Sequence, residues 1–102
     1  MTKNPFEVFQ QEAPQAAQAF NGLIAAVSAG DGLDAKTRQL LYIGIKASQG
    51  ETAAVAAHVP MAKAEGAKRE EIRDTILLTL TVCGVKGITT CLVPALETYE
   101  SC

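Results

Sequence analysis

The chain has 102 residues and a mass of 10.7 kDa, which is the size of one small domain. Hydrophobic residues make up 48% of the sequence and charged residues 20%, a balance typical of a folded globular protein. Nine basic and eleven acidic residues leave a net charge of -2, which excludes a broad basic surface for nucleic acid. We therefore expect a single domain over residues 1–102 with no nucleic-acid partner.

The first helices are expected on either side of a proline. Asn4 and Pro5 are residue types that favour the N-cap and the first position of a helix. Pro14 ends that first helix because its ring removes a backbone hydrogen bond. The second helix then begins at Pro14 and ends at the glycines of segment 30–32. Its apolar residues recur at helical spacing: Ala17, Phe20, Ile24 and Val27.

Four further helical segments follow, each ended by glycine or by the end of the chain. Asp34 is expected to cap the first of them through its carboxylate. Pro60 and Pro94 lie inside two of the segments and predict kinks there. The expected ranges are 34–48, 51–65, 68–82 and 88–99. Because no segment alternates with the period of a strand, we predict an all-α helical bundle of five to six helices, with neighbours antiparallel.

The composition of the core favours association with further copies of the chain. Aromatic residues make up only 5% of the sequence, and there is no tryptophan. A short chain whose core consists of alanine, leucine, isoleucine and valine buries a modest amount of surface alone. We therefore expect a homo-oligomer.

A cytoplasmic location without membrane contact is expected. Residues 1–9 contain Lys3 and Glu7 and no apolar run, unlike a signal peptide. The most apolar stretch, 76–93, is interrupted by glycines and Lys86 and does not resemble a transmembrane helix. Three cysteines without disulfide-framework spacing favour reduced thiols.

The candidate catalytic residues are His58 and Glu51. His58 is the one histidine of the sequence, and histidine is the side chain whose unperturbed pKa lies nearest neutrality. Glu51 lies seven residues earlier, on the same helix face and about 10 Å away along the axis. A substrate held between an imidazole and a carboxylate can exchange protons with both. The alternative is a structural one, with His58 packed among alanines and Glu51 complementing the helix dipole.

The cysteines suggest a second kind of site. Cys83 and Cys91 would be about 12 Å apart on one unbroken helix, too far for a disulfide, but the glycines between them allow the chain to fold back. A redox pair and simple burial therefore remain alternatives. Neither a zinc-ligand spacing nor a phosphate-binding loop is found, so we expect no metal and no cofactor.

Several segments resemble one known family in their order and spacing. The segments are EAP (12–14), AF (19–20), LDAKTRQL (33–40), AAH (56–58), AEGA (64–67) and REEI (69–72). Together they resemble the carboxymuconolactone decarboxylase and alkylhydroperoxidase-D-like (AhpD-like) family over residues 12–98. The resemblance implies an all-α fold in which a helical hairpin carries the site, and association into trimers or hexamers.

The sequence departs from the peroxidase branch of that family. Members of that branch are typified by a Glu on the core helix, a Cys-x-x-Cys pair, and a His four residues after the second Cys. Counted back from His58, the two Cys positions fall on Glu51 and Ala54, and the Glu position falls on Gln39. Because a thiolate is the nucleophile in peroxide reduction, the resemblance implies no ordinary thiol peroxidase site here.

The decarboxylase branch also lacks the two cysteines and carries a His on this helix. Its lactone acid substrate would require a cation, for which Lys46 and Lys63 are the candidates nearest in sequence. We therefore expect a protein that acts on or binds a small organic acid by acid–base chemistry at His58. The alternatives are a redox or antioxidant protein that uses Cys83 and Cys91, and a non-catalytic oligomeric binding protein, so whether the chain is an enzyme stays open.

Overall fold

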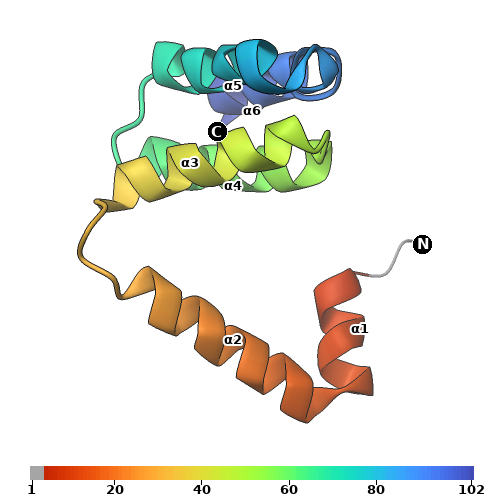
Figure 1. The fold of residues 1–102 in the computed structure, drawn as a ribbon. Coiled ribbons are helices and arrows are strands. Elements are labelled where there is room, and N and C mark those ends of the chain that lie inside the picture. The colour runs from red at the N-terminus through yellow and green to blue at the C-terminus, as the bar shows by residue number, and fades with distance from the viewer. Residues whose placement is uncertain (1–3) are drawn as a thin grey trace. The chain divides into compact units, whose positions relative to one another are not determined.

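The structure is a computed structural model that describes residues 4–102, so Lys3 lies outside the described part (Figure 1). Its α-helices are α1 (Pro5–Glu12), α2 (Pro14–Ser28), α3 (Ala35–Ser48), α4 (Thr52–Ala64), α5 (Arg69–Cys83) and α6 (Val93–Ser101). A π-helical turn, η1 (Ile88–Leu92), precedes α6. The described residues contain no strand, and the predicted all-α bundle is confirmed. The chain forms two compact units that divide after Gly32, and the single domain over 1–102 stays a prediction.

The first unit holds α1 and α2. Asn4 caps α1 by accepting a hydrogen bond from the Phe6 backbone at 2.9 Å. The break between the helices falls at Ala13, directly before Pro14, as the sequence predicts. The rings of Phe9 and Phe20 then join the two helices in an edge-to-face contact, with centroids 6.1 Å apart.

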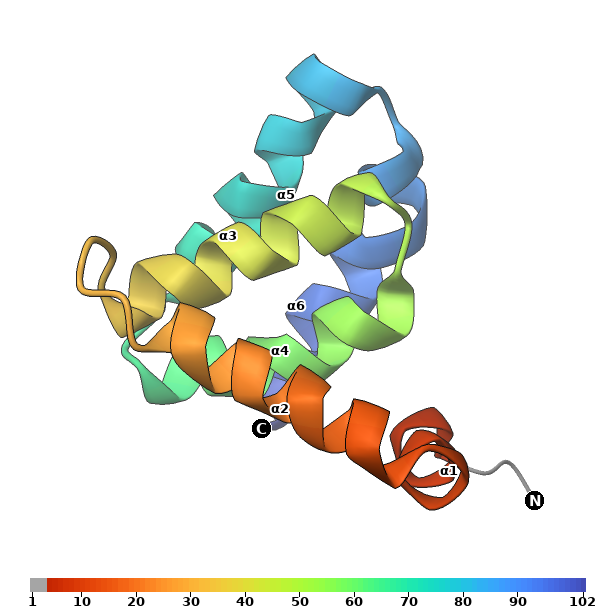
Figure 2. The ribbon, with the colours of Figure 1, turned by 60° about the horizontal axis from the view of Figure 1, so that its bottom comes forward.

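In the second unit, one glycine turn makes α4 the antiparallel neighbour of α3, and a second leads from α4 into α5, which packs against α3 instead of against α4. The predicted packing of helices joined by a glycine turn is therefore confirmed for α3 and α4 and is wrong for α4 and α5. Gly50 follows α3 with φ of 72°, and Gly66 follows α4 with φ of 95°, a conformation that side chains disfavour. After each helix, two backbone N–H groups bond back to carbonyls of its last turn, the Schellman pattern. Figure 2 shows the result, with α4 running back beside α3.

The core of the second unit lies among α3, α4, α5 and α6. Its fully buried members come from all four helices and the adjoining segments: Ile43, Ala47, Val55, Val59, Ala62, Ile72, Ile76, Cys91 and Ala95. These side chains are small, as the composition indicates. Among residues 4–102, no helix combines the length and the apolar character needed to cross a membrane.

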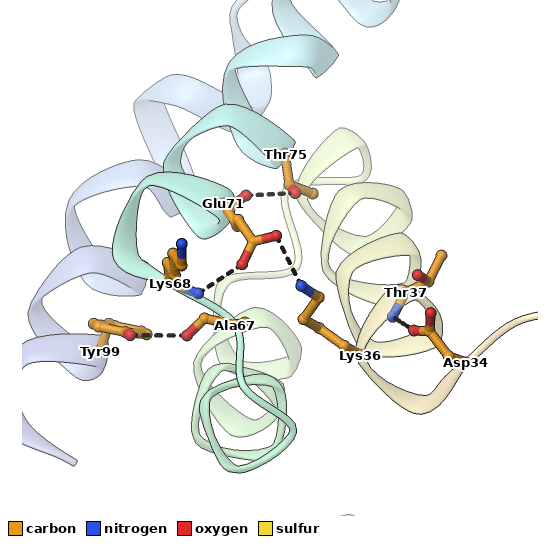
Figure 3. A network of polar contacts seen from close by, with 8 residues as sticks. All are labelled: Asp34, Lys36, Thr37, Ala67, Lys68, Glu71, Thr75 and Tyr99. Atoms are coloured by element: carbon orange, nitrogen blue, oxygen red, sulfur yellow. Dashed lines mark hydrogen bonds and ion pairs between the residues drawn. The ribbon is translucent and has the colours of Figure 1, made fainter.

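Polar contacts fix the start of α5 against α3 (Figure 3). The Glu71 carboxylate accepts a hydrogen bond from the Lys68 backbone at 2.9 Å and one from Lys36 of α3 at 3.1 Å. Both contacts hold the pKa of the Glu71 carboxyl below its ordinary value. On the same view, Asp34 caps α3 by accepting from the Thr37 backbone at 2.8 Å, as predicted.

The last helical segment, predicted as one helix over 88–99 with a kink at Pro94, differs from that prediction in its first turn. Residues 88–92 form a π-helical turn, and Pro94 stands in the first turn of α6. Because Pro94 has no N–H, the Thr90 carbonyl four residues earlier lacks its usual helical donor. The Thr52 hydroxyl of α4 donates to that carbonyl instead, at 2.8 Å. Pro60 lies inside α4, which is helical on both sides of it.

Candidate functional site

The candidate site lies where one face of α3 meets α4. Gln39, Tyr42 and Lys46 follow one another at intervals of three and four residues, so they share a face of α3. His58 projects from α4 toward two of them. Its Nδ1 lies 2.8 Å from Oε1 of Gln39, and its ring stacks on that of Tyr42. The ring centroids are 3.6 Å apart, with an angle of 21° between the planes.

His58 is only partly buried in this position, and its surroundings favour the neutral imidazole. Burial penalises the charged form and lowers the pKa of His58 below its ordinary value, and the positive charge of Lys46 lowers it further. The imidazole is therefore neutral at neutral pH. A neutral imidazole that keeps some access to solvent is the form that accepts a proton in acid–base catalysis.

The structure separates the two candidate cations. Lys63 donates to the backbone carbonyls of Tyr99 and Cys102, both at 2.9 Å, and lies 4.5 Å from the centroid of the Tyr99 ring. Lys46 lies beside the site instead, 6.0 Å from the centroid of the Tyr42 ring. Of the two lysines, Lys46 is the one whose positive charge acts on His58.

Glu51 lies at the start of α4, two turns before His58. It is exposed, and its side chain makes no capping hydrogen bond to the helix. The direct side-chain partner of His58 is Gln39 rather than Glu51. The structure therefore places His58 within α4 and Glu51 at its N-cap, and it is α3 that supplies the polar contact to His58.

The cysteines do not gather at His58. Cys91 is fully buried, and its sulfur lies 3.3 Å from the Thr90 hydroxyl and 3.9 Å from that of Thr52. Cys83 is exposed at the end of α5, and both thiols are free. Full burial keeps the Cys91 thiol away from solvent. A redox pair that reacts with peroxide requires a thiol that solvent can reach. Within residues 4–102, no cluster of three or more acidic, histidine or cysteine side chains is arranged to hold a metal ion.

A groove of about 370 Å³ lies on another face of α3, between that helix and α5. Its lining carries no charged residue, and its apolar side chains are Leu40, Leu41, Ile45, Leu78 and Val82. Cys83 lies in this lining, whereas His58 does not. The polar site and the apolar groove are thus on different faces of one helix.

Sequence reasoning found His58 and missed its immediate neighbours as a group. The spacing of Gln39, Tyr42 and Lys46 shows that they share a face of one helix. The helix also carries Lys36, Thr37 and Arg38, so polarity alone does not single out that face. The spacing does not predict which neighbouring helix this face of α3 contacts.

The protein is of the all-α class, and a hairpin of two helices, α3 and α4, carries its one histidine on the second helix. The model of the carboxymuconolactone decarboxylase family matches residues 14–97. The chain belongs to this family, and the predicted resemblance is confirmed.

A solved structure supports the same fold. The apo form of a carboxymuconolactone decarboxylase family protein from Legionella pneumophila superposes with a TM-score of 0.81. It is 23% identical, and the alignment covers 93% of this chain and 84% of that one. At this identity the likeness concerns the fold alone. A search of curated proteins returned no match.

Proposed function

We propose that the chain is an acid–base enzyme of its family that acts on a small organic acid, with His58 as the proton-transfer group. The observation that carries the proposal is the partly buried His58 held by Gln39 and Tyr42 beside Lys46. A lowered pKa supplies a neutral imidazole at neutral pH, and Lys46 supplies a positive charge for a carboxylate.

The family name suggests decarboxylation of a carboxymuconolactone as the first reaction to test. In such a step CO2 leaves, and the electron pair of the broken C–C bond stays on the carbon. One proton from solvent, delivered through the imidazole of His58, then takes the place of the carboxyl group. Lys46 would hold a carboxylate of the substrate during this step.

We propose Glu51 as a second proton-transfer group, farther from the contacts of His58 with α3. Its exposed carboxylate at the start of α4 could exchange protons with the far end of a substrate that reaches two turns along the helix. In the variant Glu51→Gln we expect a lower kcat with an unchanged fold. An unchanged kcat would remove Glu51 from the site and leave His58 in place.

The test is incubation of the protein with carboxymuconolactone, followed by CO2 release and by calorimetric binding. We expect turnover in the wild type and none in His58→Ala, with the same helical circular dichroism and the same oligomer size in both. Binding without turnover would make the chain a binding protein, the alternative that the sequence left open. Loss of assembly in His58→Ala would give His58 a structural role, and the absence of both binding and turnover would overturn the proposal.

A peroxide assay separates the redox alternative. With a dithiol reductant and an organic peroxide we expect no turnover, because Cys91 is buried and no cysteine contacts His58 within the described residues. A robust rate that is lost in Cys83→Ser would replace the acid–base proposal by a thiol mechanism.

We also propose that the working form is a homo-oligomer, in which a second copy covers the apolar groove between α3 and α5. Leu78 and Val82 are 65% and 76% exposed on α5, beside a lining that carries no charge. Such an uncharged apolar surface is typical of an interface between subunits. The trimers or hexamers implied by the family resemblance agree with this arrangement.

Sedimentation measures this association directly. We expect Leu78→Asp to lower the oligomer size because it places a charge in the groove. Val93→Asp, which changes an equally exposed apolar residue at the start of α6, is the matched control and should keep the wild-type size. A monomeric wild type would exclude the oligomer.

A further inference from the structure

α3 contacts the imidazole of His58 at an edge and at a ring face. We infer that Gln39 and Tyr42 are positioning residues that hold His58 with its proton on Nδ1, leaving Nε2 as the reactive nitrogen. The inference rests on the proposed function for what Nε2 reacts with, but the tautomer itself is a property of the free protein.

The contact with Gln39 selects the tautomer. An amide oxygen only accepts hydrogen bonds, so Nδ1 of His58, 2.8 Å from Oε1 of Gln39, is the donor. A neutral imidazole has one ring proton, and Nε2 therefore carries the free lone pair. Free histidine in water prefers the opposite tautomer, with its proton on Nε2. The protein thus inverts the intrinsic preference by one hydrogen bond.

The choice of an amide over a carboxylate has a chemical consequence. A carboxylate at this position would also accept from Nδ1, but its negative charge would favour the imidazolium. Gln39 orients the ring without adding charge, so the lowered pKa that burial and Lys46 impose on His58 is retained. The ring is oriented and stays unprotonated at neutral pH.

Tyr42 fixes the plane of the ring. Its aromatic ring lies almost parallel to the imidazole, with 3.6 Å between centroids, and so covers one face. Gln39 occupies the Nδ1 edge. A tilt of the imidazole would lose the stack on Tyr42, whereas a 180° flip about the Cβ–Cγ bond would keep the stack and lose the contact of Nδ1 with Gln39. The two residues together therefore keep Nε2 at the edge away from Gln39.

Nuclear magnetic resonance of the ligand-free protein tests the inference. Long-range 15N–1H correlation above the titration midpoint distinguishes the two ring nitrogens, because the unprotonated one resonates far downfield. We expect Nε2 to be the unprotonated nitrogen of His58 in the wild type. Finding the proton on Nε2 would overturn the inference without any variant.

Two variants of Gln39 separate positioning from a structural role. Gln39→Leu removes the acceptor at similar size, and we expect the proton to move toward Nε2. Gln39→Glu restores an acceptor, so the proton should stay on Nδ1 while the titration midpoint of His58 rises by about one unit or more. If Gln39→Leu keeps the wild-type tautomer, or if Gln39→Glu leaves the midpoint unchanged, Gln39 does not position the ring.

Tyr42→Phe and Tyr42→Leu form the matched pair for the stacking contact. The phenylalanine ring should keep the wild-type tautomer and titration, whereas leucine should reduce the fraction with the proton on Nδ1. A wild-type tautomer in Tyr42→Leu would remove Tyr42 from the inference.

The same data keep this inference separate from the proposed function. A proton on Nδ1 in a protein that neither binds nor converts carboxymuconolactone would support the positioning by Gln39 and contradict the enzyme. Turnover by a protein whose proton lies on Nε2 would support the enzyme and overturn the positioning.

Discussion

Two faces of α3 differ in whether side chains of the same chain cover them. Toward α4, the polar face formed by Gln39, Tyr42 and Lys46 meets His58 through a hydrogen bond and a stacked ring. Toward α5, Ile45 borders an uncharged groove and is 59% exposed. Polar groups need partners of defined geometry, which the hairpin supplies, whereas an apolar surface is satisfied by any apolar surface that covers it. The proposed chemistry and the proposed association therefore fall on different faces of the same helix.

The largest expected effect is on the free energy of unfolding and concerns the buried side of α3 between the two faces. Ile43 is fully buried and Ile45, two residues later, is exposed. We expect Ile43→Ala to lower the free energy of unfolding by about 2–5 kcal/mol, because it leaves a cavity in the core. The same change at Ile45 should cost less than about 0.5 kcal/mol in the monomer. Chemical denaturation at low protein concentration measures both, and equal losses would contradict the distinction between the faces.

The next effect concerns the charge on the polar face. We expect Lys46→Met to weaken the binding of a small carboxylic acid about tenfold or more, because a charged contact to the ligand is lost. Arg73→Gln removes one positive charge from the exposed side of α5 and is the control. Titration calorimetry at one salt concentration compares them. Equal weakening in both variants would mean that the total charge matters and that Lys46 has no direct contact.

The turn that brings α4 back along the polar face provides a smaller effect. Gly50 has φ of 72°, and a Cβ there would lie 2.7 Å from the Lys86 side chain. We expect Gly50→Ala to destabilise the fold by about 1–2 kcal/mol, because side chains disfavour left-handed backbone. Gly22→Ala in α2, where a Cβ meets no atom within 4 Å, is the control and should not destabilise. Thermal unfolding measures both, and a neutral Gly50→Ala would show that the turn tolerates a side chain.

The smallest expected effect is a pH dependence of stability through His58. Its pKa is lowered in the folded chain, so the unfolded chain binds more protons as the pH falls. The contribution of neutral His58 is therefore fully present above its unfolded pKa of about 6.5 and is lost as the pH falls from there toward the lower folded pKa. The wild type should lose stability over this window relative to His58→Gln, as measured by denaturation at several pH values. Parallel curves for the two proteins would contradict the lowered pKa.

Much of the local structure follows from the sequence because it depends on neighbouring residues. Asn4 and Asp34 cap the helices predicted for them, and Pro14 separates α1 from α2 as expected. Caps, proline breaks and glycine turns act over one or two turns of helix, so their signals are readable in the chain itself. The family and the all-α class follow from the same kind of information, since they rest on the order of such segments.

Only the tertiary structure decided which polar groups meet. Gln39 and His58 are nineteen positions apart, and their contact depends on how the α3 and α4 faces are turned toward each other by the glycine turn. Within the π-helical turn at 88–92, the Thr90 carbonyl that Pro94 leaves without its helical donor likewise accepts from a distant residue, the Thr52 hydroxyl of α4. Side-chain contacts between helices are set by the packing of the whole core, and the spacing of residues along one helix does not contain that packing.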